Sequence, residues 1–261
     1  MPRLAANLNY LFTEVDLMDR FEAAAKIGFR GVEYQFPYAY DKRELGARLR
    51  EHELEMVLMN LPAGDMQAGD VGIACDPERT GEFRECVLEG IDFAKALDCP
   101  QLNCLAGIAP SGIAAERLFE TFVDNLRFAA RRFAEAGLRL LIEPLNTRDR
   151  PGFYLSRSAQ AMAIIEAVGD DNLFLQFDVY HTQVMEGDIV RNFERYRHRI
   201  AHVQIADNPG RHEPGTGELN FPFILNAFDD AGYAGWVSCE YAPSTTTEAS
   251  LAWAQGYLRR S

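Results

Sequence analysis

The stretch RLLIEPLN, residues 139–146, contains a short apolar run that ends in a glutamate followed by a proline. The same pattern, an apolar run closed by a carboxylate, recurs in LQFDVYH (residues 175–181) and in VSCEY (residues 237–241). Such runs alternate with segments of helical spacing along the whole chain, which is typical of repeated strand–helix units. The predicted strands cover residues 4–9, 31–35, 55–60, 101–105, 139–143, 173–178, 200–206 and 236–240.

Eight strand–helix cycles in 261 residues correspond to about 33 residues per cycle, which is the length of a βα unit. No change of composition and no linker divides the chain. We therefore predict an α/β fold with one domain over residues 1–261, a closed (β/α)8 TIM barrel. The alternative is an open, doubly wound sheet, but the GxGxxG turn that would favour it is absent from this sequence.

The composition argues against several kinds of function. The net charge of −13 repels phosphate backbones and anionic lipids, so we expect neither nucleic acid nor a membrane as a partner. No stretch is apolar and long enough to span a bilayer or to act as a signal peptide. The five cysteines show no CxxC spacing, which argues against disulfides and against a zinc site and favours a cytoplasmic location.

Polar residues close the predicted strands. In a TIM barrel, such residues face the active-site mouth at the carboxyl ends of the strands. The closing residues are Asn9, Glu33, Asn60, Asn103, Glu143, Asp178, Gln204 and Glu240. The three asparagines are interpreted as structural. For any single carboxylate, a salt bridge or a loop cap is the alternative interpretation.

The last four closing residues suggest a metal site. Glu143, Asp178, Gln204 and Glu240 offer three carboxylates and one amide oxygen, a ligand set that suits Mg²⁺ best and also Mn²⁺. Without a cation, the three carboxylates would repel one another until at least one held a proton. A metal-independent mechanism, in which a protonated glutamate acts as the acid, therefore stays open.

Three further residues are predicted to bind the substrate. His181 follows Asp178 by three residues, so it can reach the mouth, where nearby carboxylates should favour its protonated form. Arg211 and Arg79 lie in the two longest predicted loops. A guanidinium is the expected anchor for a small carboxylate because it binds both oxygens at once, and Arg211 is the better candidate of the two.

Longer motifs connect the chain to a known family. They are NLPAGD (60–65), LIEPLN (141–146), FDVYH (177–181), HVQIADNPGRHEPGTGELN (202–220) and CEYAP (239–243). With these motifs the chain resembles the hydroxypyruvate isomerase family, within the xylose-isomerase-like barrels that also include ketose epimerases. The block at residues 202–220 is the most specific, because the single acidic positions are shared by many relatives.

The resemblance implies a reaction and roles for the site residues. Glu143 and Glu240 would be the catalytic acid/base pair and, with Asp178 and Gln204, would surround a divalent metal. The implied reaction converts hydroxypyruvate to tartronate semialdehyde through an enediolate whose negative charge the metal stabilises. Related epimerases carry a histidine where this chain has Gln204, and this difference favours Mg²⁺ over a softer ion.

Several alternatives remain open from the sequence. A hydride shift could replace proton transfer, and the substrate could be a longer 2-oxo-tetronate or a ketose. A sugar-acid binding barrel is the non-enzymatic alternative, and an exposed apolar helix face could support a homo-oligomer. Cleavage of damaged DNA, known among related barrels, is disfavoured because only five histidines and an acidic chain are present.

Overall fold

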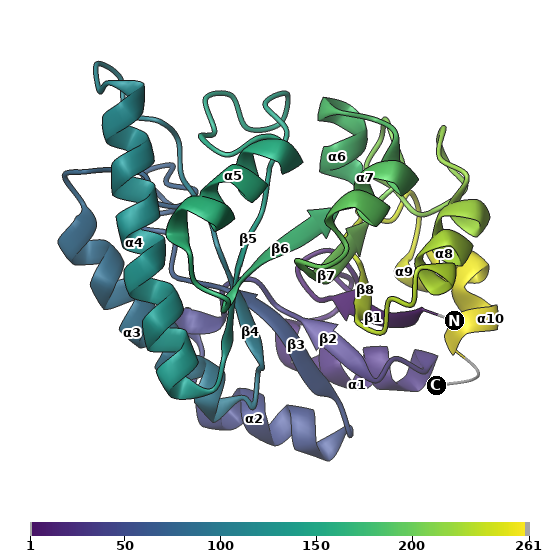
Figure 1. Cartoon of the computed structure of the whole chain (residues 1–261). Helices are drawn as coiled ribbons and strands as arrows, with labels where there is room; N and C mark the ends of the chain where they lie inside the picture. Colours follow the sequence, from purple (N-terminus) through teal and green to yellow (C-terminus); the bar gives the residue numbers. More distant parts are fainter. Residues whose placement is uncertain (1, 259–261) are drawn as a thin grey trace.

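Eight parallel strands pair in sequence order, and the ring closes where β8 pairs with β1 (Figure 1). The computed structural model describes residues 2–258. The strands are β1 (Arg3–Asn7), β2 (Gly31–Glu33), β3 (Glu55–Asn60), β4 (Gln101–Cys104), β5 (Arg139–Ile142), β6 (Leu173–Asp178), β7 (Ile200–Ile205) and β8 (Trp236–Cys239). The predicted closed TIM barrel is confirmed.

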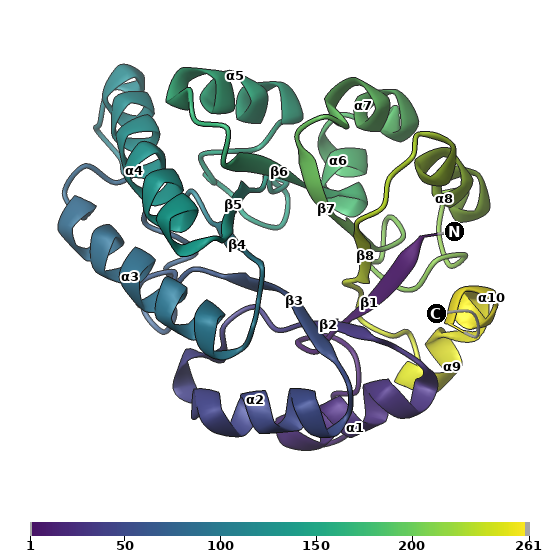
Figure 2. The ribbon, with the colours of Figure 1, turned by 60° about the horizontal axis from the view of Figure 1, so that its bottom comes forward.

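Helices form an outer ring around the strands (Figure 2). They are α1 (Leu17–Ile27), α2 (Lys42–Glu51), α3 (Thr80–Ala96), α4 (Ala115–Ala136), α5 (Ser158–Val168), α6 (Val179–Met185), α7 (Ile189–Tyr196), α8 (Phe221–Asp230), α9 (Thr247–Ser250) and α10 (Gln255–Leu258), with 3₁₀ turns at Pro37–Ala39 and Ala252–Ala254. Two helices, α6 and α7, follow β6, where the simple repeat has one. Among residues 2–258, no helix combines the length and the apolar character needed to cross a bilayer.

The longest helix, α4, shows how the outer core forms. Phe122, Leu126 and Phe133 recur at helical spacing and are fully buried, so one face of α4 packs inward. Phe119, three residues before Phe122, is by contrast 38% exposed. The helix ends at Gly137, whose φ of 74° lies in the left-handed region that glycine adopts without strain.

The interior of the barrel is mostly polar, with a small apolar cluster at one end. This cluster consists of the buried side chains of Ala5, Val57, Leu58 and Leu141, with Phe174, Ala201 and Trp236 packed against them. The next inward positions are polar and buried: Glu33, Gln101, Gln176, His202 and Ser238. TIM barrels are more often filled by branched apolar side chains. A polar interior keeps hydrogen-bonding groups directly below the mouth, where they can orient the residues at the strand ends.

Candidate active site

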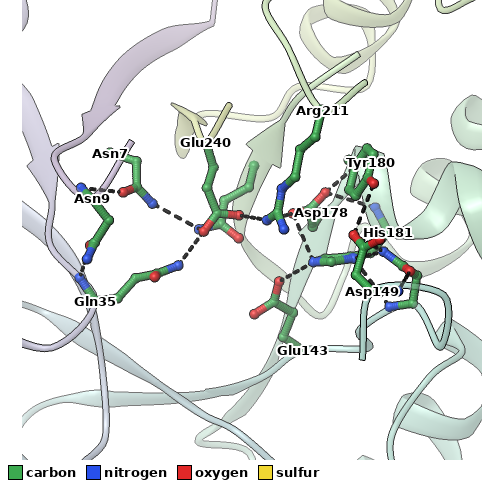
Figure 3. A network of polar contacts seen from close by, with 12 residues as sticks. Asn7, Asn9, Gln35, Glu143, Asp149, Asp178, Tyr180, His181, Arg211 and Glu240 are labelled. Atoms are coloured by element: carbon green, nitrogen blue, oxygen red, sulfur yellow. Dashed lines mark hydrogen bonds and ion pairs between the residues drawn. The ribbon is translucent and has the colours of Figure 1, made fainter. Parts of the chain in front are cut away.

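The candidate active site is a pocket of about 290 Å³ at the carboxyl ends of the strands. Its charged and titratable lining residues are Tyr10, Asp70, Glu143, Asp149, Arg150, His181, Arg211 and Glu240. Both predicted acid/base glutamates therefore line one pocket. Figure 3 shows Arg211 between Glu240 and Asp178, with Glu143 facing them from the neighbouring side.

Glu240 directly follows β8 and is held by three donors. The side-chain amide of Asn7 donates to Oε1 over 3.2 Å, and the amide of Gln35 donates to the same oxygen. The guanidinium of Arg211 donates to Oε2 over 2.9 Å. Burial, together with the negative charges of Asp178 and Glu143, still raises the pKa of Glu240 well above its ordinary range, although Arg211 opposes that shift.

Glu143 directly follows β5 and has fewer partners than Glu240. Its Oε2 accepts a 2.8 Å hydrogen bond from the Asn103 amide, and its Oε1 lies 4.0 Å from Nε2 of His181. Burial and the nearby charge of Asp178 raise the pKa of Glu143 well above its ordinary range. A carboxyl group whose pKa is raised by burial binds a proton more readily than a surface glutamate, which suits general acid or base catalysis.

Asp178 ends β6 and also caps α6. Its Oδ1 accepts from the backbone N–H groups of Tyr180 (2.6 Å) and His181 (3.1 Å), which satisfies two of the free donors at the start of the helix. The other oxygen, Oδ2, lies 3.7 Å from Nε2 of His181. The cap therefore fixes the position of both Asp178 and His181.

His181 is almost completely buried, and this corrects one expectation. Burial lowers the pKa of His181 to about 4, even though Asp178 and Asp149 raise it, so the imidazole is neutral near pH 7. Its Nδ1 faces the backbone N–H of Asn146 (3.2 Å) and the side-chain amide of the same residue (2.6 Å). Because both groups are donors, Nδ1 accepts and the hydrogen resides on Nε2, directed toward Glu143 and Asp178.

The site contains a group of ligands that could hold a metal. Ligand atoms of Glu143, Asp178 and His181 all lie within 4.8 Å of one another, and all three residues are buried. The chemistry of this set fits a divalent cation, because two desolvated carboxylates face each other and a positive charge would offset their repulsion. Glu240 adds a third carboxylate beside Asp178.

Gln204 makes its hydrogen bonds inside the barrel. It pairs in register with Asp178 across β6 and β7 and is fully buried. Glu143 and Glu240 line the pocket, whereas Gln204 and Asp178 do not. The amide of Gln204 donates to Glu33 over 2.8 Å, and its carbonyl oxygen accepts from Gln176 over 2.5 Å. One lone pair of that oxygen is therefore already in use, and only the second remains for a metal.

Arg211 lies in the long loop between β7 and α8. Its φ of 55° is in the left-handed region, an unusual conformation for a residue with a side chain. The rings of Tyr10 and Tyr180 flank its guanidinium, with centroids at 5.2 and 5.0 Å. One guanidinium nitrogen reaches Glu240 and lies 3.9 Å from Asp178, whereas the buried Nε has no hydrogen-bond partner among residues 2–258.

Asp207 organises the loop that carries Arg211. Its Oδ2 accepts from the N–H groups of Gly215 and Gly217, both at 2.9 Å, and its backbone carbonyl accepts from the N–H of Arg211. Four hydrogen bonds reach the two carboxylate oxygens in all, since Asn208 and Leu219 donate to Oδ1. The loop is therefore a fixed support for Arg211.

Arg79 is placed away from the pocket. It lies at the start of α3, where its guanidinium forms a bidentate pair with Glu82 and a 2.8 Å ion pair with Asp70. Asp70 lines the pocket but Arg79 does not. The structure thus gives Arg79 a role in holding the loop that carries Asp70.

Sequence reasoning missed several residues of this site. Asn7 and Gln35 donate to Glu240, and Tyr10, Asp149 and Arg150 line the pocket. The strand alternation contained the signal for Asn7, because Ala5 points into the barrel and the residue two positions later must do the same. The others lie on loops, where no such period applies.

Buried carboxylates at the mouth of a closed (β/α)8 barrel are arranged as in the active sites of barrel enzymes. The family model of xylose isomerase-like TIM barrels matches residues 21–260. Hydroxypyruvate isomerase of Escherichia coli is 49% identical, and the match covers 98% of this chain and 100% of that protein. A 2-oxo-tetronate isomerase of Cupriavidus necator is 43% identical over 100% of both chains.

A solved structure is similar over nearly the same length. It is described as an AP endonuclease, family 2, from Brucella melitensis, and it superimposes with a TM-score of 0.96 at 43% identity over 98% of this chain and 99% of that chain. The chain belongs to the xylose isomerase-like TIM barrel family. It is an isomerase, as are the full-length relatives named above, and the resemblance inferred from its motifs is confirmed.

Proposed function

We propose that this isomerase interconverts hydroxypyruvate and tartronate semialdehyde (2-hydroxy-3-oxopropanoate). The observation that carries the proposal is the pair of buried glutamates, Glu143 and Glu240, which approach one small pocket from β5 and from β8. Proton transfer between adjacent carbons needs a group able to remove a proton and a group able to return one. The hydroxypyruvate isomerase relative adds support for this substrate.

In the proposed reaction, one glutamate removes a proton from C3, and the electron pair of the broken C–H bond forms a C2–C3 double bond. Negative charge then develops on the C2 oxygen. A proton returns to C2 from a glutamate, the hydroxyl proton on the C3 oxygen passes to the C2 oxygen, and C3 becomes the aldehyde carbon. Atoms and electrons balance without an external oxidant or reductant.

Two groups of the pocket suit the oxygen on which charge develops. The free Nε–H of Arg211 and the Nε2–H of His181 are hydrogen-bond donors at the same side of the site. Donors fixed before the reaction stabilise charge at no cost of reorganisation. Arg211 is therefore proposed to bind a substrate oxygen at the reacting carbons, with His181 donating beside it.

We further propose that Glu143, Asp178 and Glu240, with the remaining lone pair of Gln204, hold Mg²⁺ or Mn²⁺. Such an ion would supply positive charge to the enediolate. His181 could enter the ligand set through Nε2 only if its hydrogen moved to Nδ1, which faces the Asn146 donors. This favours oxygen ligands and hence a hard cation.

Removal of metal is the first test. Protein treated with a chelator would be given hydroxypyruvate in D₂O and followed by proton NMR, before and after addition of Mg²⁺ or Mn²⁺. We expect turnover to return with the metal and deuterium to appear at carbon, because an enediolate exchanges with solvent. Product without deuterium would favour a hydride shift, and full turnover without metal would contradict the metal proposal.

A 2-oxo-tetronate is the second candidate substrate. The support is specific, because a relative with that name is 43% identical over the whole of both chains. The same glutamates would act on the same pair of carbons, with one further hydroxymethylene group to accommodate. Comparison of kcat/KM for hydroxypyruvate, a 2-oxo-tetronate and a neutral ketose would rank the substrates. No measurable turnover of hydroxypyruvate would reject the first proposal.

DNA cleavage is not proposed, despite the description of the Brucella melitensis structure. An enzyme that binds DNA needs a basic surface for the phosphates, whereas this chain has a net charge of −13. The pocket lining carries the four acidic residues Asp70, Glu143, Asp149 and Glu240 against two arginines. A small anionic substrate therefore needs an unpaired cationic side chain in this pocket to offset the repulsion from these four acidic residues.

A further inference from the structure

Of the two arginines that line the pocket, only one is paired. Arg211 is bound to Glu240 and lies close to Asp178. For Arg150, by contrast, no hydrogen bond or ion pair of the side chain is present within residues 2–258. Arg150 is exposed where it lines the acidic pocket, so its unpaired guanidinium is available to form a charge-assisted pair with an anionic ligand.

We propose that Arg150 binds the carboxylate of the substrate and thereby selects 2-oxo and 2-hydroxy acids over neutral ketoses. The proposal rests on the proposed function and adds a residue that determines its specificity. The sequence favoured Arg211 and Arg79 for this task. Arg211 sits at the catalytic carboxylates, where it suits the reacting oxygens, and the donors of Arg79 are taken by Asp70 and Glu82.

The loop that carries Arg150 is held firmly. Asn146 and Asp149 bond to each other twice: the Asp149 N–H donates to Oδ1 of Asn146, and the Asn146 amide donates to Oδ2 of Asp149. The hydroxyl of Tyr180 also donates to Asp149, and the N–H of Arg150 donates to the carbonyl of Asn146 over 3.1 Å. An anchor fixed in advance loses little entropy when it binds.

The residues that follow Arg150 are held by hydrogen bonds to the β4–α4 loop. The N–H of Ala109 donates to the carbonyl of Gly152 over 3.0 Å, and the N–H of Tyr154 donates to the carbonyl of Gly107 over 2.9 Å. Because these bonds tie the β5–α5 loop to the β4–α4 loop, the backbone at Arg150 is supported on both sides. The backbone of Arg150 is thus fixed, whereas its side chain is free to reach a ligand.

The positive charge of Arg150 affects the pKa values of other groups that line the pocket. Burial raises the pKa of Tyr10, in the loop after β1, to about 12 and lowers the pKa of His181 to about 4. The charge of Arg150 adds a small downward contribution to both pKa values. The catalytic glutamates would repel a substrate carboxylate, so the carboxylate must lie away from them. Arg150 at the rim allows that orientation, with C1 toward the rim and C2 and C3 toward Glu143 and Glu240.

The test measures charge preference directly. D-glycerate and its neutral amide, glyceramide, would be titrated into the holoenzyme by calorimetry, with wild type, Arg150→Met and Arg150→Lys. A charge-assisted pair contributes enough that we expect wild type to prefer glycerate by about 10- to 100-fold. Arg150→Met should lose that preference, and Arg150→Lys should retain part of it because lysine keeps the charge without the planar fork.

Arg148→Met is the matched control. Arg148 lies in the same loop and is exposed, but it does not line the pocket, so its removal should leave the preference unchanged. If Arg150→Met kept the wild-type preference, or if Arg148→Met lost it equally, or if wild type showed none, the carboxylate assignment would be overturned. Thermal unfolding would verify that each variant is folded.

The same variants separate this inference from the proposed function. With hydroxypyruvate, Arg150→Met should raise KM and lower kcat/KM by about 10- to 100-fold, with a smaller effect on kcat. If wild type turned over neither hydroxypyruvate nor a 2-oxo-tetronate, yet its preference for glycerate depended on Arg150, the function would fail and the anchor would stand. If turnover occurred but neither KM nor preference depended on Arg150, the anchor would fail and the function would stand.

Discussion

At the scale of single residues, the two glutamates differ in their surroundings. Glu240 receives three side-chain hydrogen bonds, from Asn7, Gln35 and Arg211, whereas Glu143 receives one, from Asn103. More donors stabilise the ionised form. Each glutamate is nevertheless buried beside the other negative charges, so neither is an ordinary surface carboxylate.

Replacing either glutamate by glutamine should abolish most turnover and leave the fold intact. We expect Glu143→Gln and Glu240→Gln each to lower kcat by about 10²- to 10⁴-fold, because a proton-transfer group is lost. Glutamine keeps the shape of the side chain, so both variants should still fold, which thermal unfolding would verify. Glu166→Gln on the exposed face of α5 is the control. Near wild-type kcat in either site variant would rule out its acid/base role.

The neutral state of His181 predicts a pH dependence of stability. The folded-state pKa of about 4 lies below the ordinary 6.5. Between these values the unfolded chain binds a proton that the folded chain does not, so stability falls as the pH falls. Between pH 7 and pH 5, chelator-treated wild type should lose about 2 kcal/mol more than His181→Asn, measured by urea unfolding. Equal losses would refute a buried neutral imidazole.

At the scale of elements, the loop from β7 to α8 depends on one glycine. Gly217 donates its N–H to Asp207, and a Cβ at this position would lie 1.8 Å from the carbonyl oxygen of Asn208. The loop would have to open, and Arg211, whose N–H donates to the Asp207 carbonyl, would move with it. The position of Arg211 therefore depends on the close contact between Gly217 and Asn208.

Gly217→Ala should lower both stability and turnover. We expect a loss of about 2 kcal/mol in the free energy of unfolding, together with a fall in kcat, measured by denaturant titration and steady-state kinetics. The control is Gly81→Ala near the start of α3, where no atom lies within 4 Å of the added Cβ. Alanine is favoured in helices, so this variant should be at least as stable as wild type. Normal kinetics in Gly217→Ala would contradict the coupling to Arg211.

The strands show what could be predicted from the sequence. Glu143, Asp178 and Glu240 were identified because each closes a local apolar run, and no knowledge of distant residues was needed. The surroundings of Gln204 could not be predicted, since its partners Glu33 and Gln176 lie 171 and 28 residues away. Which side chains share a layer inside a barrel depends on the register between strands, and a single strand does not encode that register.

The roles of two loop arginines, Arg79 and Arg150, were not predicted from the sequence, for two different reasons. Arg79 could have been assigned correctly, because Glu82 follows it at i+3 in a segment with helical spacing, a common ion-pair arrangement. Arg150 could not, because the run TRDR at residues 147–150 has the composition of any solvated loop. The end of β1 at Asn7 rather than at Asn9 also changed which asparagine reaches Glu240.

At the scale of the whole molecule, the free thiols report on global unfolding. All five cysteines are buried and unpaired, and burial raises the pKa of Cys75 to about 12 and that of Cys86 to about 11. We expect no labelling by a thiol reagent at pH 8 in the native state and labelling of all five in denaturant. Rapid labelling of a native cysteine would reveal local opening of the barrel.

The closure of the ring between β1 and β8 has a consequence for synthesis of the chain. Asn7 and Glu240, which bond to each other, are separated by 233 positions, and β1 gains its second neighbour only when β8 is in place. During translation, a nascent chain that has released β1 to β7 therefore still exposes two unpaired strand edges and lacks Glu240, one of the two glutamates proposed to transfer protons. Aggregation risk is highest at that moment, and we expect activity only after the last strand has left the ribosome.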